Sequence, residues 1–382
     1  MNKSLVSVAA LLLGIVACNG NKQTQEVPPL TLAGNDPAKF VSDKDSTLGL
    51  FTLSNANGMS VDITNFGGRL VSIMVPDRTD SLVDVLLGFD NLKDYLTIPS
   101  DFGATIGRYA NRINQGKITI DGTDYQLETN NYGHTLHGGP TGWQYQVYSV
   151  EKLGDNKLKL TIASPDGDNG FPGTVTASAT YTLTDDNALD IQYEATTDKP
   201  TVINMTNHAY FNLSGDPSMS AMDHLLYINA DSITPVDSTF MTTGEMVSVT
   251  GTPFDFTSPK PISQAISATD DQQIVYGHGI DHNFVLNTGG DINTLAAKLT
   301  SLKSGITLEV YTNEPGIQVY TGNFLDGTVT GKRGIAYKDR PSVCLETQHF
   351  PDSPNKPQWP SVVLRPGETY RSHCIFRFSV DR

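Results

Sequence analysis

Apolar and polar side chains alternate with a period of two along much of this chain, which is the spacing of a β-strand with one buried face. Such alternation is typical of antiparallel sheets, in which one face packs on a core and the other meets water. Two of the runs surround an Asp-Gly turn, the dipeptide favoured in two-residue β-hairpins. The alternating runs are Lys117–Ile120, Thr123–Leu127, Leu158–Ile162, Val175–Leu183, Leu189–Ala195, Thr307–Tyr311 and Ile375–Val380. We therefore expect an all-β protein built as an antiparallel β-sandwich.

Helical spacing is rare, and the best candidates for helices, Ile262–Ile266 and Asp291–Leu295, are short. The 382 residues, 38% of them hydrophobic, can bury a sizeable core. A chain of this length can form one large all-β domain or two ordinary domains. Because we find no sharp composition shift and no fixed-period repeat after residue 30, we expect a single domain over residues 35–382.

The first residues have the pattern of an export signal. Lys3 precedes an apolar run from Leu5 to Val16, shorter than the about 20 residues of a membrane-spanning helix. The end of this run, at 15–18, resembles the lipobox of bacterial lipoproteins, in which a cysteine is acylated. We expect residues 1–17 to be a signal peptide and Cys18 to be lipidated; an ordinary signal peptide that happens to contain a cysteine is the alternative. Residues 18–34 then form a polar tether, which predicts an exported bacterial lipoprotein of the cell envelope, in the periplasm or at the outer membrane.

Charge and cysteine content restrict the partners. Lys and Arg number 26 against 41 Asp and Glu, a formal net charge of −15. Phosphate backbones repel such a chain, so we expect no nucleic-acid partner. Cys344 and Cys374 lie in apolar strand-like runs, and the sequence leaves open whether they pair or remain free thiols. We find no cysteine or histidine spacing typical of a zinc site and no cofactor motif.

Five segments interrupt the apolar pattern with polar residues. The first, if it is a strand, places four side chains on one face: Asn204, Thr206, His208 and Tyr210. Such a polar row is costly inside a sheet unless that face lines a cleft. In the second, Glu346 follows strand-like residues, where burial could raise the pKa of its carboxyl group into a range useful for catalysis. The other three are Gly107–Ile113 with two arginines and an asparagine, Thr135–Gly139 with His137, and Gly279–Phe284 with Asp281.

Taken together, these segments resemble those of the aldose 1-epimerase (galactose mutarotase) family. They occur in the family's order, and the resemblance covers the chain from about residue 35 onward. The segments are Gly-Arg-Tyr-Ala-Asn-Arg-Ile (107–113), Leu-His-Gly-Gly (136–139), Thr-Asn-His-Ala-Tyr-Phe-Asn-Leu (206–213), Asp-His-Asn-Phe (281–284), Gln-Val-Tyr-Thr-Gly-Asn-Phe-Leu (318–325) and Leu-Glu-Thr-Gln-His-Phe-Pro-Asp (345–352). The resemblance implies a large antiparallel β-sandwich of the galactose mutarotase type, with a sugar cleft on one face.

The resemblance also implies a reaction and its residues. Interconverting the α and β anomers of a hexose such as galactose or glucose needs a base at the C1 hydroxyl and an acid at the ring oxygen, with reversed roles for ring closure. By similarity, Glu346 is the base and His208 the acid, and His137 hydrogen-bonds near the ring oxygen and helps to hold or shuttle the proton. The residues implied in binding the hydroxyl groups are Asn111, Arg112, Asp281 and Gln318. This chemistry requires no metal and no cofactor.

Two departures from the family's pattern flank the predicted cleft and leave the preferred sugar open. They lie at residues 130–135 and 140–145. Two other classes of protein remain as alternatives. A glycoside hydrolase could use Asp281 and Glu346 as paired carboxylates, and a lipid-anchored sugar-binding protein without catalysis would need no acid opposite a base. The presence of both His208 and Glu346 in their motifs favours the epimerase.

Overall fold

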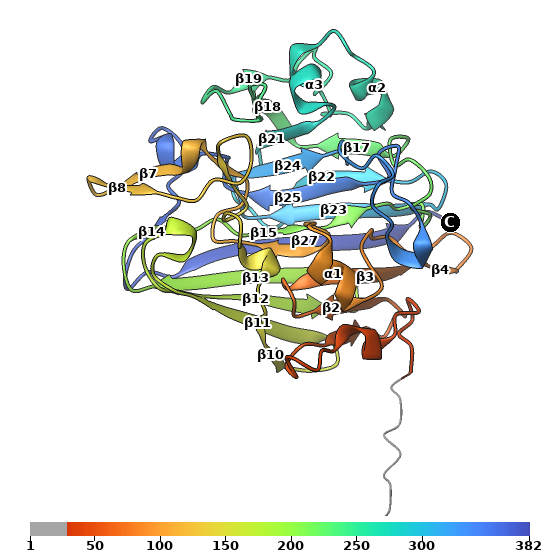
Figure 1. Cartoon of the computed structure of the whole chain (residues 1–382). Helices are drawn as coiled ribbons and strands as arrows, with labels where there is room; N and C mark the ends of the chain where they lie inside the picture. The colour runs from red at the N-terminus through yellow and green to blue at the C-terminus, as the bar shows by residue number, and fades with distance from the viewer. Residues whose placement is uncertain (1–28) are drawn as a thin grey trace, which may run out of the picture.

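The computed structural model describes residues 29–382, which form a sandwich of two large sheets (Figure 1). Both sheets are antiparallel throughout, as the alternating sequence predicts. In order across the nine-stranded sheet, the strands are β10 (Ser149–Lys152), β11 (Lys157–Ser164), β12 (Val175–Leu183), β13 (Ala188–Thr197), β27 (Tyr370–Val380), β23 (Ile306–Thr312), β22 (Leu295–Thr300), β17 (Leu225–Ile228) and β20 (Lys260–Pro261). Those of the six-stranded sheet are β16 (Tyr210–Phe211), β25 (Val343–Gln348), β24 (Gly316–Tyr320), β21 (Asp281–Leu286), β18 (Ala230–Thr234) and β19 (Val247–Ser248).

Smaller elements surround the sandwich. A four-stranded sheet precedes it in the sequence, and Figure 1 shows the β7–β8 hairpin projecting from the side. The four strands are β1 (Leu50–Ser54), β2 (Ser60–Thr64), β3 (Arg69–Pro76) and β4 (Leu82–Asp84). The paired short strands are β5 (Ala104–Ile106) with β15 (Thr206–His208), β6 (Arg112–Ile113) with β9 (Thr135–Leu136), β7 (Lys117–Ile120) with β8 (Thr123–Gln126), and β14 (Thr201–Val202) with β26 (Val363–Leu364). The α-helices are α1 (Leu92–Thr97), α2 (Ile262–Ile266) and α3 (Gln272–Gly277). None of the helices in residues 29–382 is both long and apolar enough to cross a bilayer.

The two sheets bury their apolar faces against each other. On β27, Cys374, Phe376 and Phe378 point into the core, where they join Val343 and Leu345 of β25. The alternate residues of β25 are buried on its opposite face. The six-stranded sheet is therefore covered on both sides, and its outer face can hold polar groups away from water.

The sequence predicts one of the two helices correctly. Helix α2 has the predicted bounds. The helix expected over Asp291–Leu295 is wrong, because the segment is a turn that leads into β22. The Asp291 carboxylate accepts hydrogen bonds from the backbone N–H of Asn293 (3.0 Å) and the hydroxyl of Thr294 (2.8 Å). Such a side-chain-to-backbone bond competes with helix formation.

The N-terminal predictions lie largely outside the described residues. This applies to the signal peptide at 1–17 and to lipidation at Cys18. Of the predicted tether, residues 29–34 are described, and there the Thr31 hydroxyl donates to the buried Asp62 carboxylate of β2 (2.6 Å). Both cysteines of the described chain, Cys344 and Cys374, are free and buried.

Candidate active site

A cavity of about 300 Å³ opens on the outer face of the six-stranded sheet. Six of the seven residues predicted for catalysis or sugar binding line it: Asn111, Arg112, His137, His208, Asp281 and Glu346. The seventh, Gln318, is buried beside Glu346 in the β24–β25 pairing, and its Nε2 donates to the Asp281 Oδ1 (2.7 Å). Arg108, from the same segment as Arg112, is buried elsewhere and donates to the carbonyls of Pro172 and Gly173. The cavity therefore gathers segments that are far apart in the sequence.

His208 and Glu346 face each other at the centre of the cavity. Strand β15 carries His208 and β25 carries Glu346; the His208 Nε2 and the Glu346 Oε1 are 3.6 Å apart, and both side chains are buried. Burial raises the pKa of Glu346 well above its ordinary value, and the Asp281 and Asp101 carboxylates add to this shift. Burial lowers the pKa of His208, while Asp101 acts in the opposite direction. The site therefore contains a base and an acid within reach of one small substrate.

The face predicted for the His208 segment is formed in part. The strand breaks at Ala209, but the rings of His208 and Tyr210 still stack, with centroids 4.9 Å apart, and both line the cavity. Asn204 instead donates from its amide to the backbone carbonyls of Ala110 (3.3 Å) and His349 (3.2 Å). The polar row is thus divided between the cavity and the backbone connections beside it.

His137 is fixed as a neutral hydrogen-bond donor. Its Nδ1 accepts from the backbone N–H of Asn111 (3.1 Å), and its own backbone N–H donates to the Asn111 carbonyl (3.1 Å). Both residues have left-handed backbones, with φ of 51° for His137 and 62° for Asn111. Because a backbone N–H can only donate, the neutral ring must carry its proton on Nε2. Burial lowers the pKa of His137 to about 3, which keeps the ring neutral.

Asp101, His137 and His208 bring three possible metal-ligand atoms within 4.8 Å of one another. Two imidazoles and a carboxylate are a common ligand set for divalent transition metals. A metal-bound histidine, however, usually donates its other ring N–H to an acceptor. Here the Nδ1 of His137 is itself an acceptor for Asn111, so its Nε2 has no lone pair to offer. The three residues therefore do not fit a three-ligand metal site.

A cation and a carboxylate form one wall of the cavity. The Arg112 Nε donates to the Asn131 Oδ1 (3.0 Å), and its guanidinium lies 4.9 Å from the centroid of the Phe240 ring. Burial raises the pKa of Asp281, and Arg112 and Gln318 oppose that shift. A guanidinium, an amide and a carboxylate can together donate to and accept from vicinal sugar hydroxyls.

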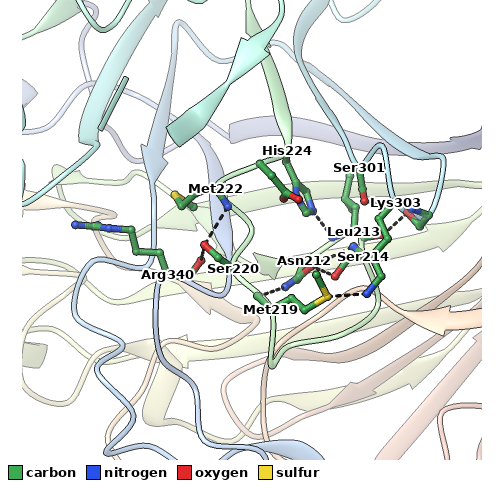
Figure 2. A network of polar contacts seen from close by, with 12 residues as sticks. Asn212, Leu213, Ser214, Met219, Ser220, Met222, His224, Ser301, Lys303 and Arg340 are labelled. Carbon is green, nitrogen blue, oxygen red and sulfur yellow. Dashed lines mark hydrogen bonds and ion pairs between the residues drawn. The ribbon is translucent and has the colours of Figure 1, made fainter. Parts of the chain in front are cut away.

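A polar network joins the segments that follow β16 and precede β25 (Figure 2). The Asn212 amide donates to the carbonyls of Pro341 (2.8 Å) and Met219 (3.0 Å), and its Oδ1 accepts from the Ser214 hydroxyl (2.6 Å). The Leu213 backbone N–H donates to the His224 Nε2 (3.0 Å). The network therefore links the chain that continues from β16, next to His208, with the chain that leads into β25, which carries Glu346.

Sequence reasoning missed several residues of the cavity. Asp101, Tyr320 and Phe324 line it, and neither their spacing nor their types mark them in the sequence. Tyr320 and Phe324 both fall in the matched segment at 318–325, which was the only signal for them. Asp101 precedes β5, and only the pairing of β5 with β15, in which Ala104 lies opposite His208, brings it to the site.

Comparison with known proteins gives consistent results. The family model described as aldose 1-epimerase matches residues 49–377. The galactose mutarotase of Mus musculus is 43% identical over 322 residues, which cover 84% of this chain and 92% of that protein. The aldose 1-epimerase of Escherichia coli (strain K12) is 42% identical over 335 residues, with coverage of 87% and 95%.

Solved structures agree with the sequence comparisons. An aldose epimerase homologue from C. elegans superposes with a TM-score of 0.81 at 33% identity, covering 88% of this chain and all of that one. The galactose 1-epimerase of Lactobacillus acidophilus gives a TM-score of 0.78 at 31% identity, with coverage of 89% and 97%. The similarity therefore extends over both sheets and the cavity.

Proposed function

The chain belongs to the aldose 1-epimerase family and is a mutarotase, and we propose that Glu346 and His208 carry out the proton transfers that interconvert α and β hexose anomers. The observation that supports this most directly is the buried Glu346–His208 pair, 3.6 Å apart in a polar cavity. In the hemiacetal, O1 and the ring oxygen O5 are both bonded to C1. A base and an acid this close can therefore serve the two oxygens at once.

Ring opening uses the pair in its charged form. The Glu346 carboxylate takes the proton from the C1 hydroxyl, the C1–O5 bond breaks, and protonated His208 gives its proton to O5. The products are the open-chain aldehyde, a neutral Glu346 acid and a neutral His208. Burial raises the pKa of Glu346 and lowers that of His208, so the dry cavity favours this neutral product pair. Rotation about the C1–C2 bond and the reverse transfers close the ring to either anomer.

The remaining predicted residues hold the sugar. Asp281 accepts from hydroxyl groups, Arg112 and the Asn111 amide donate to them, and Gln318 orients the Asp281 carboxylate through its 2.7 Å hydrogen bond. His137 donates its Nε2–H to the ring oxygen. It holds the proton-accepting oxygen in place but does not shuttle a proton, because the Asn111 N–H occupies its second ring nitrogen.

Polarimetry of freshly dissolved sugars tests the activity. The protein should speed the approach of α-D-galactose or α-D-glucose to equilibrium rotation well above the rate in buffer. A rate equal to that in buffer for both sugars contradicts mutarotase activity. Release of reducing ends from a glycan would instead support the hydrolase, in which Asp281 and Glu346 act as paired carboxylates. Sugar binding without acceleration would support the non-catalytic binding protein.

We also propose that the chain is exported and anchored through a lipid on Cys18, on the basis of the signal-like residues 1–17 and the lipobox-like end at 15–18. In a bacterial host fed an alkyne-tagged fatty acid, the full chain should incorporate the label and fractionate with membranes. Cys18→Ser should lose the label, whereas Cys374→Ser, which removes a buried thiol, should keep it. Label retained in Cys18→Ser contradicts the anchor.

A further inference from the structure

Asp101 brings a carboxylate into the sugar cavity that the proposed mechanism does not use. It lies in the loop between α1 and β5 and lines the cavity beside Ser100. Within residues 29–382, the Asp101 Oδ1 and the Ser100 Oγ are buried atoms without a hydrogen-bond partner. Buried polar atoms are almost always paired. Two unpaired polar atoms side by side in a substrate cavity indicate a ligand that pairs with them.

The backbone of the loop is held on both sides of this carboxylate. The fully buried Arg69 donates to the carbonyls on either side of Asp101, to Ser100 (2.9 Å) through Nη2 and to Phe102 (3.0 Å) through Nη1. The Asp101 carbonyl itself accepts from the Ala104 backbone N–H (3.0 Å). At Gly103, with φ of 65°, a Cβ would lie 2.0 Å from the Leu70 carbonyl oxygen, so the chain packs closely here. The backbone that carries the carboxylate is therefore fixed before any ligand arrives.

The position of Asp101 relative to the histidines identifies the group it faces. Its carboxylate lies within 4.8 Å of ring nitrogens of both His137 and His208, the residues proposed to act at the ring oxygen. In a hexopyranose, the carbon next to the ring oxygen on the side away from C1 is C5, which carries the hydroxymethyl group. The hydroxyl nearest to the histidines, other than that on C1, is thus O6.

The opposite wall already has its own carboxylate. Asp281 is held by Gln318, which lies directly opposite Glu346 in the β24–β25 pairing. Asp101 instead approaches from the β5–β15 side, where Ala104 is paired with His208. Besides Glu346, the cavity therefore has two carboxylates, and they are positioned by different strand pairs.

We propose that Asp101 binds the C6 hydroxyl of the sugar and makes the enzyme selective for sugars that carry this hydroxyl; the inference rests on the roles proposed above for His137 and His208. Hydrogen bonds to a charged group contribute enough for about a 10- to 100-fold difference in kcat/KM. The unpaired Ser100 hydroxyl can join the same contact. The substrate class is then hexoses rather than 6-deoxyhexoses of the same ring configuration.

The test compares sugars that differ by this one hydroxyl. Wild-type protein should have a higher kcat/KM for D-galactose than for 6-deoxy-D-galactose, and for D-glucose than for 6-deoxy-D-glucose. In Asp101→Ala, kcat/KM should fall about 10- to 100-fold for the two hexoses and little for the two deoxy sugars, so that the preference for the hexoses largely disappears. Glu245→Ala, which removes an exposed carboxylate, should change neither value. Asp101→Asn, which keeps the shape of the side chain, serves as the second variant, and thermal melting confirms that both variants fold.

Other outcomes overturn the inference. If kcat/KM of Asp101→Ala falls equally for the hexoses and the deoxy sugars, and its pH profile shifts, Asp101 acts through the charge of His208 and not through O6. Unchanged kcat/KM for all four sugars means that Asp101 has no part in the reaction. Failure of the mutarotase function itself looks different, because wild-type protein would then accelerate the mutarotation of no sugar.

Discussion

Glu346→Gln should slow mutarotation of galactose and glucose by about 10²- to 10⁴-fold, the range expected when a general base is removed. Glutamine has nearly the same shape as glutamate but cannot take the proton from the C1 hydroxyl. The KM should change much less than kcat, because Arg112, Asn111 and Asp281 still bind the hydroxyl groups. Initial rates measured by polarimetry give both parameters.

The fold of this variant should survive. The Glu346 Oε2 is buried and unpaired, and burial raises the pKa of the carboxyl group, so its charged form costs free energy in the folded protein. A neutral glutamine removes that cost, and we expect an equal or higher melting temperature. Glu245→Gln, on an exposed side chain, should match wild type in both rate and melting temperature.

The pH profile gives an independent measure of the same residue. The reactive form has Glu346 deprotonated and His208 protonated, so the pair carries one proton in total. Because burial raises the pKa of Glu346 and lowers that of His208, the pair keeps this proton up to the raised pKa, and wild-type kcat/KM should fall as the pH rises above it. In the residual activity of Glu346→Gln this fall should move down to the lowered pKa of His208, the remaining acid. A variant with full activity, or with the same alkaline limb, would show that another group is the base.

Local sequence signals were sufficient for much of the fold. The β7–β8 hairpin forms as predicted, because Asp121 and Gly122 both take the positive φ that a tight hairpin turn requires. Strand β12 has the predicted bounds, since nine alternating residues are long enough to fix both its type and its register. The Asp291 turn was missed because its hydrogen bonds come from side chains, which hydrophobic periodicity does not report.

The site was predictable as far as its motifs extend. His208, Glu346 and their companions meet in one cavity, but their meeting depends on pairings between distant segments, such as β24 with β25 and β5 with β15. The position of Gln318 between Glu346 and Asn283, from which it reaches Asp281, follows from the register across three strands and could not be read from one sequence. Asp101 was missed for the same reason. The spacing of residues along a strand predicts on which face of the strand a side chain lies, but not which other strand pairs with that strand.

His208→Asn should also lower kcat by about 10²- to 10⁴-fold, because ring opening then lacks the acid that protonates O5. Asparagine fills much of the same space and can donate a hydrogen bond, but it cannot transfer a proton. The matched control is His373→Asn, which removes the histidine of a pair with Asp190 (2.8 Å) in the nine-stranded sheet. That variant should keep its rate.

The double variant Glu346→Gln/His208→Asn tests whether the two residues act in one step. If the base and the acid transfer their protons together, loss of either one abolishes the same route, and the double variant should be about as slow as the slower single variant. If the two losses instead multiply, the residues act independently, and the concerted assignment of Glu346 to O1 and His208 to O5 is wrong. Melting temperatures equal to or above that of the wild type in all three variants would show that the lost rate comes from the chemistry and not from unfolding. The His208 Nε2 and the Glu346 Oε1 lie 3.6 Å apart in a buried cavity, which asparagine and glutamine also fill.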